Sequence, residues 1–438
     1  MSSALPSPAR TGGREFFTIV TVGQALALLS GVRAVEVETV ALAEALGRTP
    51  ARALTSPHAL PGFARSTVDG YAVLAADTYS AGESLPAYLE VVGSVAMGRP
   101  AEVLVRPGTA VAVPTGAVLP EGADAVVMVE HTQVTMPGAV EVTRPVASGD
   151  GIVRADEDVA PGADLVPSGR PLRAQDLGLL AAAGLVLVEV HGRPRVGIVS
   201  TGDEVVPPDT AHLQPGQVRD ATASALAGLV LAAGGEPVPL GIVGDDATAL
   251  EQVLRDAVAS CDLVVVSAGS SVGARDETAG VVARLGAPGI LCHGLALRPG
   301  KPTLLADVAG VPVVGLPGNP LSALVVFRLV GVPLLHRLAG ITTVPPEPVV
   351  RGRLDRQVPS QAGRLDVVQV QLVDPADDAK DARGTSRAKA DDGVRPVTPV
   401  FGASALLSVL TAADGWFVIT EDATGLPSGA EVDVTLYR

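Results

Sequence analysis

Residues 263–276 read LVVVSAGSSVGARD, a short apolar run that passes into serines and glycines and ends on Arg275 and Asp276. Similar apolar runs and helix-like segments alternate on both sides of this stretch. The runs lie at residues 196–200, 236–243 and 311–316, and the helical patterns at 221–233, 248–259, 277–285 and 321–338. Short strands that alternate with helices indicate a parallel sheet, and wholly apolar strands suit a sheet covered on both faces. The pattern predicts a doubly wound α/β domain at residues 193–342.

The segments on either side of the α/β domain have a different residue pattern. Helical spacing over residues 20–46 and 174–183 predicts a helical region, and valine-rich runs between Pro/Gly turns at 88–95, 110–113 and 125–130 are typical of a small β domain. The predicted fold class is therefore α/β plus β in a multidomain chain. Its predicted parts are a flexible tail at 1–13, a discontinuous helical region at 14–54 and 151–192, an inserted β domain at 55–150, and a strand-rich C-terminal domain at 347–438.

Composition limits the classes of function. The 438 residues carry a formal net charge of −15, which repels nucleic acid and anionic membranes. Two cysteines are too few for a disulfide framework or a structural zinc site, and the six histidines show no ligand spacing. The N-terminal segment lacks the apolar core of a secretory signal, and no uncharged apolar run approaches the roughly 18 residues of a membrane span. We expect a cytoplasmic protein that binds neither nucleic acid nor membrane.

Polar motifs follow the predicted strands of the α/β domain. In an open α/β sheet, ligands bind outside the carboxyl ends of the strands, so these loops should converge on one site. Their glycines allow close approach of backbone N–H groups, and the helices that follow favour phosphate. Each loop alone is also explained as an ordinary turn. The loops are STGDE (200–204), GDD (244–246), SAGSSVGARD (267–276) and LPGNP (316–320).

Carboxylates gather at the same predicted edge. Clustered acids repel one another and any phosphate unless a cation lies between them, and Mg²⁺ is bound by one or two carboxylates together with substrate phosphates. For a single aspartate, such as Asp246 or Asp276, a helix N-cap explains the residue equally well. The cluster as a whole favours a divalent metal. Its members are Asp203, Glu204, Asp220, Asp245, Asp246 and Asp276.

A basic turn, RPGKP at residues 298–302, supplies the opposite charge. Two cations held by prolines and a glycine suit an oxyanion or a phosphate, although a solvated turn has the same composition. In the β domain, the segments at 66–72 and 114–117 carry polar residues that ordinary turns also explain. From the residues alone we predict a metal-assisted reaction on a phosphate-bearing ligand at an α/β edge.

The ordered set of motifs carries a more specific resemblance. In chain order the motifs are STVDGYA (66–72), PTGA (114–117), EDV (157–159), STGDE (200–204), SVGARD (271–276), PGKP (299–302) and LPGNPLSA (316–323). Together they resemble the molybdopterin molybdenumtransferase family, which includes the enzymatic domain of the scaffold protein gephyrin. The resemblance covers the chain from about residue 15 to residue 438. It implies a molybdopterin-binding-like α/β domain, a C-terminal β-barrel and an elongated homodimer with its active site between subunits.

The resemblance also implies roles for single residues. Asp69, Thr115, Asp158, Glu204 and Asp276 match catalytic positions, and Glu204, Asp246 and Asp276 would hold Mg²⁺. Arg364 and Ser408 are further polar positions that match the family's cleft loosely. The residues implied to bind molybdate and the pterin are Ser271, Arg298, Lys301, Pro302, Pro317, Gly318, Asn319, Ser322 and Ser404.

The implied reaction converts adenylated molybdopterin and molybdate into molybdenum cofactor and AMP, with Mg²⁺. Expected partners are a second copy of the chain, a molybdopterin adenylyltransferase and chaperones of molybdoenzymes. Three residues depart from the family pattern, namely Arg298 for lysine, Ala268 for glycine and Thr222 for asparagine. Two alternatives stay open, a non-catalytic cofactor carrier or scaffold, and a molybdopterin adenylyltransferase.

Overall fold

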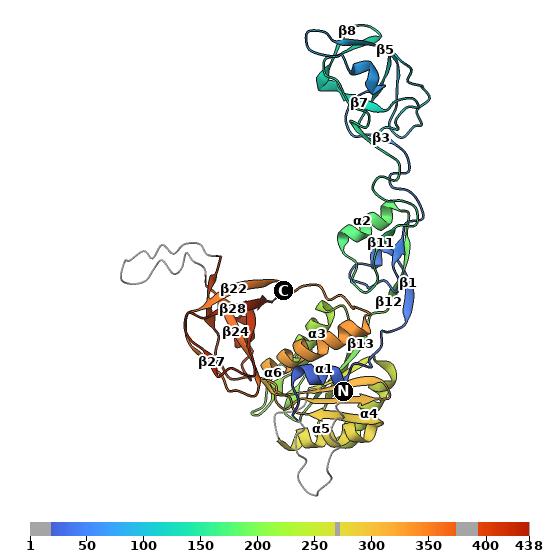
Figure 1. Ribbon diagram of the computed structural model, residues 1–438. Helices are drawn as coiled ribbons and strands as arrows, with labels where there is room; N and C mark the ends of the chain where they lie inside the picture. Colours follow the sequence, from blue (N-terminus) through green and yellow to red (C-terminus); the bar gives the residue numbers. More distant parts are fainter. Residues whose placement is uncertain (1–18, 268–271, 374–392, 438) are drawn as a thin grey trace, which may run out of the picture. The chain divides into compact units, whose positions relative to one another are not determined.

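A computed structural model describes residues 19–267, 272–373 and 393–437, and of residues 272–276 only the backbone (Figure 1). The chain forms two compact units. One consists of residues 39–190, and the other of residues 1–38 together with 191–438. Both units have buried apolar cores of their own. We propose the finer division into domains given above as the organisation of the chain.

A six-stranded sheet with the order β16-β13-β17-β21-β20-β18 forms the centre of the larger unit. Four strands are parallel, so their carboxyl ends meet at one edge. The doubly wound α/β domain predicted from the sequence is thereby confirmed. The four parallel strands are β13 (Arg195–Thr201), β16 (Glu236–Val243), β17 (Leu263–Ser267) and β21 (Val311–Leu316).

Helices cover both faces of this sheet (Figure 1). Alternate residues of a strand point to opposite faces, so Ile198 of β13 lies in one core and Val199 in the other. The first core includes side chains of α3 (Ala221–Ala232), α6 (Pro320–Val326), η4 (Phe327–Gly331) and α7 (Val332–Leu338). The second includes side chains of α4 (Ala247–Ser260) and α5 (Val272–Leu285).

The helical stretch Pro320–Leu338 is long and apolar enough to cross a membrane by length and composition alone. However, 61% of its most apolar window is buried inside the protein. Leu321, Phe327 and Leu335 of this stretch are buried in the core of the α/β domain. Its apolar character therefore reflects packing against the sheet.

Two strands of the sheet run against the others. β20 (Leu304–Val308) is antiparallel to β21, and β18 (Pro288–His293) is antiparallel to β20. The sheet is therefore mixed, not purely parallel as predicted. Ala309 and Gly310 join β20 to β21 with positive φ angles of 54° and 91°, as a two-residue type I′ hairpin requires. Alanine is a poor signal for such a turn, which explains why the sequence pattern missed the hairpin.

The C-terminal domain is a closed β-barrel, as the resemblance implied. The sheet order β24-β25-β22-β28-β26 closes through a further pairing of β24 with β26. An additional strand, β19 (Leu297–Arg298), comes from the α/β part of the chain and pairs in parallel with β24. The barrel strands are β22 (Val349–Leu354), β24 (Leu365–Leu372), β25 (Arg395–Pro399), β26 (Gly415–Ile419) and β28 (Glu431–Leu436).

The smaller unit contains a six-stranded sheet with the order β7-β4-β6-β5-β9-β8. A second core in the same unit surrounds α2 (Ala174–Ala182), whose Asp176 is 5% exposed and accepts hydrogen bonds from Arg170 and Arg173. The strands are β4 (Gly70–Val73), β5 (Ala87–Ser94), β6 (Thr109–Val113), β7 (Ala125–Met128), β8 (Thr132–Met136) and β9 (Ala139–Val142).

The helix predicted over residues 20–46 is wrong for most of its length. The only α-helix in this range is α1 (Val22–Leu28), and a single 3-10 turn, η1 (Leu42–Glu44), follows near its end. Thr21 is the N-cap of α1, and Ala25 lies in the core of the α/β domain. Residues 37–41, VETVA, form strand β1 (Val37–Ala41), which pairs with β12 (Leu187–His191). β-Branched Val35, Val37 and Thr39 alternate with Glu36 and Glu38, and this alternation favours a strand over the helical spacing.

Candidate functional site

A cleft of about 750 Å³ lies in the larger unit, between the α/β loops and the C-terminal barrel. The basic turn 298–302 and the loop after β21 form one side, and residues of β24 and of segment 400–404 form the other. Seven of the residues that the resemblance assigned to molybdate and the pterin line this cleft. They are Arg298, Lys301, Pro302, Pro317, Asn319, Ser322 and Ser404, and Arg364 lines it as well.

The basic turn is held in shape by its own backbone. The Lys301 carbonyl accepts from the N–H groups of Leu295 and Thr303, both at 2.9 Å. The Thr303 hydroxyl donates to the Gly300 carbonyl at 2.7 Å. Gly300 has φ +130°, and a Cβ there would lie 2.5 Å from Cγ2 of Val326. Only glycine fits at this position, so the turn presents Arg298 and Lys301 on a fixed backbone.

The loop after β21 is tied to the barrel side of the cleft. The Asn319 side-chain amide donates to the Ser404 hydroxyl at 2.9 Å, and the Leu321 N–H donates to the Ser404 carbonyl at 3.2 Å. Pro320 occupies the first turn of α6, where its missing N–H costs nothing. Asn319 and Ser404, both predicted as binding residues, therefore also fix one wall of the cleft against the other.

A buried acid, which the sequence analysis missed, accompanies the cations of the cleft. Asp366 is 3% exposed and accepts from Arg364 Nε at 2.8 Å and from Arg298 Nη1 at 3.4 Å. Among the described lining residues, three are cationic and one is anionic, which leaves two uncompensated positive charges. In a chain of net charge −15, this local reversal of sign makes the cleft a site for an anion.

Gln369 is a second lining residue that the sequence analysis missed. Its side-chain oxygen accepts a hydrogen bond from the Tyr437 hydroxyl, whereas its Nε2, buried, has no hydrogen-bond partner in the described part of the chain. Burial raises the pKa of Tyr437 to about 12, so the phenol remains a donor at neutral pH. No sequence motif marks Gln369, because it lies within a regular strand.

Three members of the predicted acidic cluster, Asp203, Glu204 and Asp245, lie near one another at the carboxyl edge of the sheet. Asp203 Oδ1 accepts from the Asp245 N–H at 2.9 Å. Desolvation and the neighbouring charges of Asp203 and Glu204 raise the pKa of Asp245, an exposed residue, above its usual value. The charges of Asp203 and Glu204 act on Asp245 in the same direction, which is the mutual repulsion expected of clustered acids.

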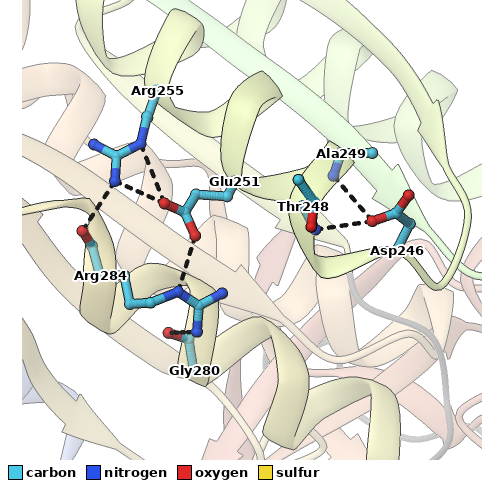
Figure 2. Close-up of polar contacts among 7 residues, drawn as sticks. All are labelled: Asp246, Thr248, Ala249, Glu251, Arg255, Gly280 and Arg284. Carbon is cyan, nitrogen blue, oxygen red and sulfur yellow. Dashed lines mark hydrogen bonds and ion pairs between the residues drawn. The ribbon is translucent and has the colours of Figure 1, made fainter.

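Two other aspartates of the predicted cluster are helix caps. Asp246 Oδ1 accepts from the N–H groups of Thr248 and Ala249 at the start of α4, at 2.8 and 3.1 Å (Figure 2). Asp220 caps α3 by accepting from the Ala223 N–H at 3.0 Å. The helix-cap explanation therefore holds for both. A cap uses one carboxylate oxygen, so it leaves the other available to a ligand.

The described side chains include no group of three His, Cys, Asp or Glu residues arranged to hold a metal. Asp276 lies in α5, but its side chain is outside the described residues, as are Ser271 and Ala268. The oxygen donors that are described suit Mg²⁺ bound by one or two carboxylates and completed by substrate phosphates. They do not form a closed protein site.

The catalytic positions predicted in the smaller unit fall in three loops, two of which are bonded to each other. Asp69 Oδ1 accepts from the Thr115 N–H at 2.7 Å and from its hydroxyl at 3.0 Å, and these bonds lower the pKa of Asp69. Gly70 must follow, because a Cβ there would lie 1.9 Å from the Val127 carbonyl oxygen. Asp158 lies in a separate loop, where its N–H donates to the Leu60 carbonyl.

Comparison with known proteins decides the family. A molybdopterin molybdenumtransferase of Nostoc sp. is 38% identical to this chain, over 70% of each of the two proteins. Family sequence patterns also match, for the MoeA N-terminal region (domain I and II) at residues 20–184, the "probable molybdopterin binding domain" at 197–337 and the MoeA C-terminal region (domain IV) at 351–437. The chain belongs to the MoeA family.

Further members resemble nearly the whole chain. Molybdopterin molybdenumtransferase 1 of Mycobacterium tuberculosis is 32% identical over 90% of this chain and 93% of its own length. The crystal structure of the molybdopterin biosynthesis MoeA protein of Pyrococcus horikoshii matches with a TM-score of 0.80 and 30% identity, over 96% of this chain and 100% of that chain. The MoeA architecture therefore extends over all the regions described above.

The departures from the MoeA pattern have different settings in the structure. Arg298 is one of the two arginines bound to Asp366. Thr222 is 6% exposed in the first turn of α3, two residues after the capping Asp220. Of the two departures in the described part of the chain, Arg298 is the one that lines the cleft.

Proposed function

We propose that the cleft between the α/β loops and the barrel is the place where this chain inserts molybdenum into molybdopterin. Membership of the MoeA family makes the chain a molybdopterin molybdenumtransferase, an enzyme of molybdenum cofactor biosynthesis. Its substrates are molybdopterin and molybdate. The observation that carries the location is the cluster of Arg298, Lys301 and Arg364 in a chain that is otherwise strongly acidic.

Molybdate is the ligand that this charge favours. It is a tetrahedral dianion, and the described lining of the cleft carries two uncompensated positive charges. Guanidinium groups donate several N–H bonds in a fixed plane, and lysine adds a mobile point charge. Ser322 and Asn319 offer neutral hydrogen-bond partners at the same surface. In this proposal, Arg298, Lys301 and Ser322 bind the oxyanion, and Ser271 and the loop at 317–319 bind the pterin phosphate.

The acidic edge is proposed to bind Mg²⁺ together with the pyrophosphate of adenylated molybdopterin. Glu204, Asp246 and Asp276 are the proposed ligands, and Asp203 and Asp245 add negative charge nearby. A bound Mg²⁺ would supply charge neutralisation for the phosphoanhydride that is cleaved. The carboxylates themselves would bind and orient the cation.

The proposed assembly is a cytoplasmic homodimer in which Asp69, Thr115 and Asp158 complete the site of the partner subunit. The Asp69–Thr115 pair supports this role, because hydrogen bonds from Thr115 hold the Asp69 carboxylate ionised and oriented although it is exposed. A molybdopterin adenylyltransferase is the proposed source of the substrate, and chaperones of molybdoenzymes are the proposed recipients of the product.

The decisive experiment is AMP release from adenylated molybdopterin by the purified chain, with and without molybdate and Mg²⁺. We expect release only when both ions are present. Tight binding without release would favour a cofactor carrier, and consumption of ATP with no AMP release would favour an adenylyltransferase. Asp276→Ala should abolish release and leave the fold intact, and near-normal turnover in that variant would contradict the proposed role of Asp276.

A further inference from the structure

We infer that Asp366 is a positioning residue for the oxyanion, which acts through Arg298 and Arg364 without touching the substrate itself. The inference rests on the proposed function, because it assigns a task in the same cleft. Asp366 is 3% exposed, whereas the side chains of Arg298 and Arg364 are 60% and 30% exposed. A carboxylate covered by two more exposed cations is placed to orient them.

The backbone alone brings the three side chains together. β19 pairs in parallel with β24, and the register places Arg298 opposite Asp366. Arg364 lies directly before β24 and two residues before Asp366, and its Nε reaches the Asp366 carboxylate at 2.8 Å. Asp366 therefore links a cation from the α/β part of the chain to a cation that immediately precedes the first strand residue of β24.

The hydrogen bonds leave each arginine free to bind a ligand. Arg364 donates to Asp366 Oδ1 through Nε at 2.8 Å and to Oδ2 through Nη2 at 3.5 Å, and Arg298 donates to Oδ2 through Nη1 at 3.4 Å. A guanidinium group has five N–H donors, so several donors of each arginine remain. Long side chains lose rotamer freedom when they bind a ligand, and holding them in place beforehand lowers this entropic cost.

This arrangement also explains why arginine at residue 298 departs from the lysine of the family pattern. The rigid fork of arginine can bond Asp366 with one nitrogen and hold other nitrogens in a known plane. A lysine ammonium carries its three donors on one nitrogen at the end of a flexible stem, so a bond to Asp366 does not hold the other donors in a fixed plane. Arg298 and Asp366 therefore form a matched pair in this chain.

Charge and positioning predict opposite effects for the loss of this carboxylate. Asp366 carries a negative charge next to the proposed site of a dianion, so by Coulomb's law alone its removal should strengthen binding. If Asp366 orients the arginines, its removal should weaken binding in spite of the extra positive charge. The direction of the change therefore separates the two roles.

The test is equilibrium binding of molybdate alone to the full-length chain and to Asp366→Asn. We expect affinity to fall by at least about tenfold, the range for loss of a group that orients a ligating side chain. Glu431→Gln is the matched control, because Glu431 bridges Arg353 and Arg351 at 2.9 and 3.1 Å in the same barrel but does not line the cleft. It should bind molybdate as the parent chain does.

A double-mutant cycle with Arg298→Gln shows whether Asp366 acts through Arg298. The loss caused by Asp366→Asn should shrink in the Arg298→Gln background, whereas a purely structural role would give the same loss in both. If Asp366→Asn does not fold, Asp366→Glu replaces it, since it keeps the charge but moves the carboxylate, and weaker binding is again expected.

Tighter or unchanged binding in a folded Asp366 variant would overturn this inference. Failure of the parent chain to bind molybdate at all would contradict the proposed function instead. If the parent chain binds molybdate and the Asp366 variant binds it equally well, the proposed function is unaffected and only the positioning role of Asp366 is excluded.

Discussion

The larger unit carries carboxylates at two places that differ in whether cationic partners surround them. In the cleft, Asp366 is buried and is bonded to Arg298 and Arg364. At the carboxyl edge of the sheet, Asp245 lies beside Asp203 and Glu204, and all three influences on its pKa raise it. A compensated carboxylate fixes the geometry of its partners. A cluster of carboxylates without cationic partners instead favours the binding of a cation. The buried Asp366 is therefore suited to a structural role, and the acidic edge of the sheet to ligand binding.

The largest effect of a substitution is expected at Asp176 in the smaller unit, because this carboxylate has the most complete set of arginine partners. This acid accepts from Arg170 at 2.6 and 2.9 Å and from the Arg173 N–H at 2.8 Å. Asp176→Asn should lower the free energy of unfolding by about 3 kcal/mol, because Arg170 would be left partly buried and unpaired. Chemical denaturation at pH 7 measures this, with the exposed Asp164→Asn as control.

The pH dependence of the same variant gives a second check. Hydrogen bonds from Arg170 and Arg173 hold the pKa of Asp176 well below its usual value. The ion pair therefore contributes stability above about pH 4, and this contribution is lost as the pH falls toward the folded-state pKa. The difference between Asp176→Asn and the parent should shrink on acidification. A difference that stays constant down to pH 2 would contradict the ion-pair explanation.

At the uncompensated edge, Glu204→Gln should affect activity and leave stability unchanged. We expect the rate of AMP release at fixed Mg²⁺ to fall about 100-fold, the upper end for loss of a metal-positioning group. The melting temperature should be unchanged or slightly raised, because a repulsion is removed. Glu236→Gln is the control, since Glu236 is an exposed acid at the amino end of β16. Normal AMP release by Glu204→Gln would remove Glu204 from the metal site.

The elements that the sequence predicted correctly are those with a strong local signal. β13, β16, β17 and β21 are apolar runs bounded by turns, and their parallel order follows from the helices between them. β1 was missed because a few apolar residues at helical spacing also occur in a short strand. β19 was missed because two residues form a strand only when another chain segment pairs with them.

The candidate site shows the same limit. The basic turn and the loop after β21 could be placed together, because the latter follows a parallel strand and both carry recognisable motifs. Asp366 and Gln369 could not be placed in the site from the sequence. Their roles depend on contacts between β24 and residues 68 positions away in the chain. The alternation of Arg364 and Asp366 in a strand-like segment was the one local signal for the acid. No comparable signal exists for Gln369.

Asp246 combines a structural role with a proposed binding role, because it is both a helix cap and a proposed metal ligand. Asparagine caps helices as well as aspartate does, whereas alanine does not. Asp246→Asn should keep the melting temperature and weaken Mg²⁺ binding about tenfold. Asp246→Ala should also lose about 1 kcal/mol of stability. Thermal unfolding with and without Mg²⁺ separates these effects, and Mg²⁺ binding that survives in both variants would leave Asp246 as a cap only.

The smallest expected effect is a pH dependence of Mg²⁺ binding that arises at Asp245. Its raised pKa means that the folded chain takes up this proton more readily than the unfolded chain, so stability falls as the pH rises above about 4 through the folded-state pKa. A cation competes with that proton, and Mg²⁺ affinity should therefore rise a few-fold over the same window and then level off. The Mg²⁺-induced shift in melting temperature between pH 4.5 and 7 measures this rise. Asp245→Asn should flatten the profile, whereas the exposed Asp209→Asn should preserve it. A profile that keeps its slope in Asp245→Asn would assign the proton to another group, and the raised pKa of Asp245 would then reflect repulsion that Mg²⁺ does not relieve.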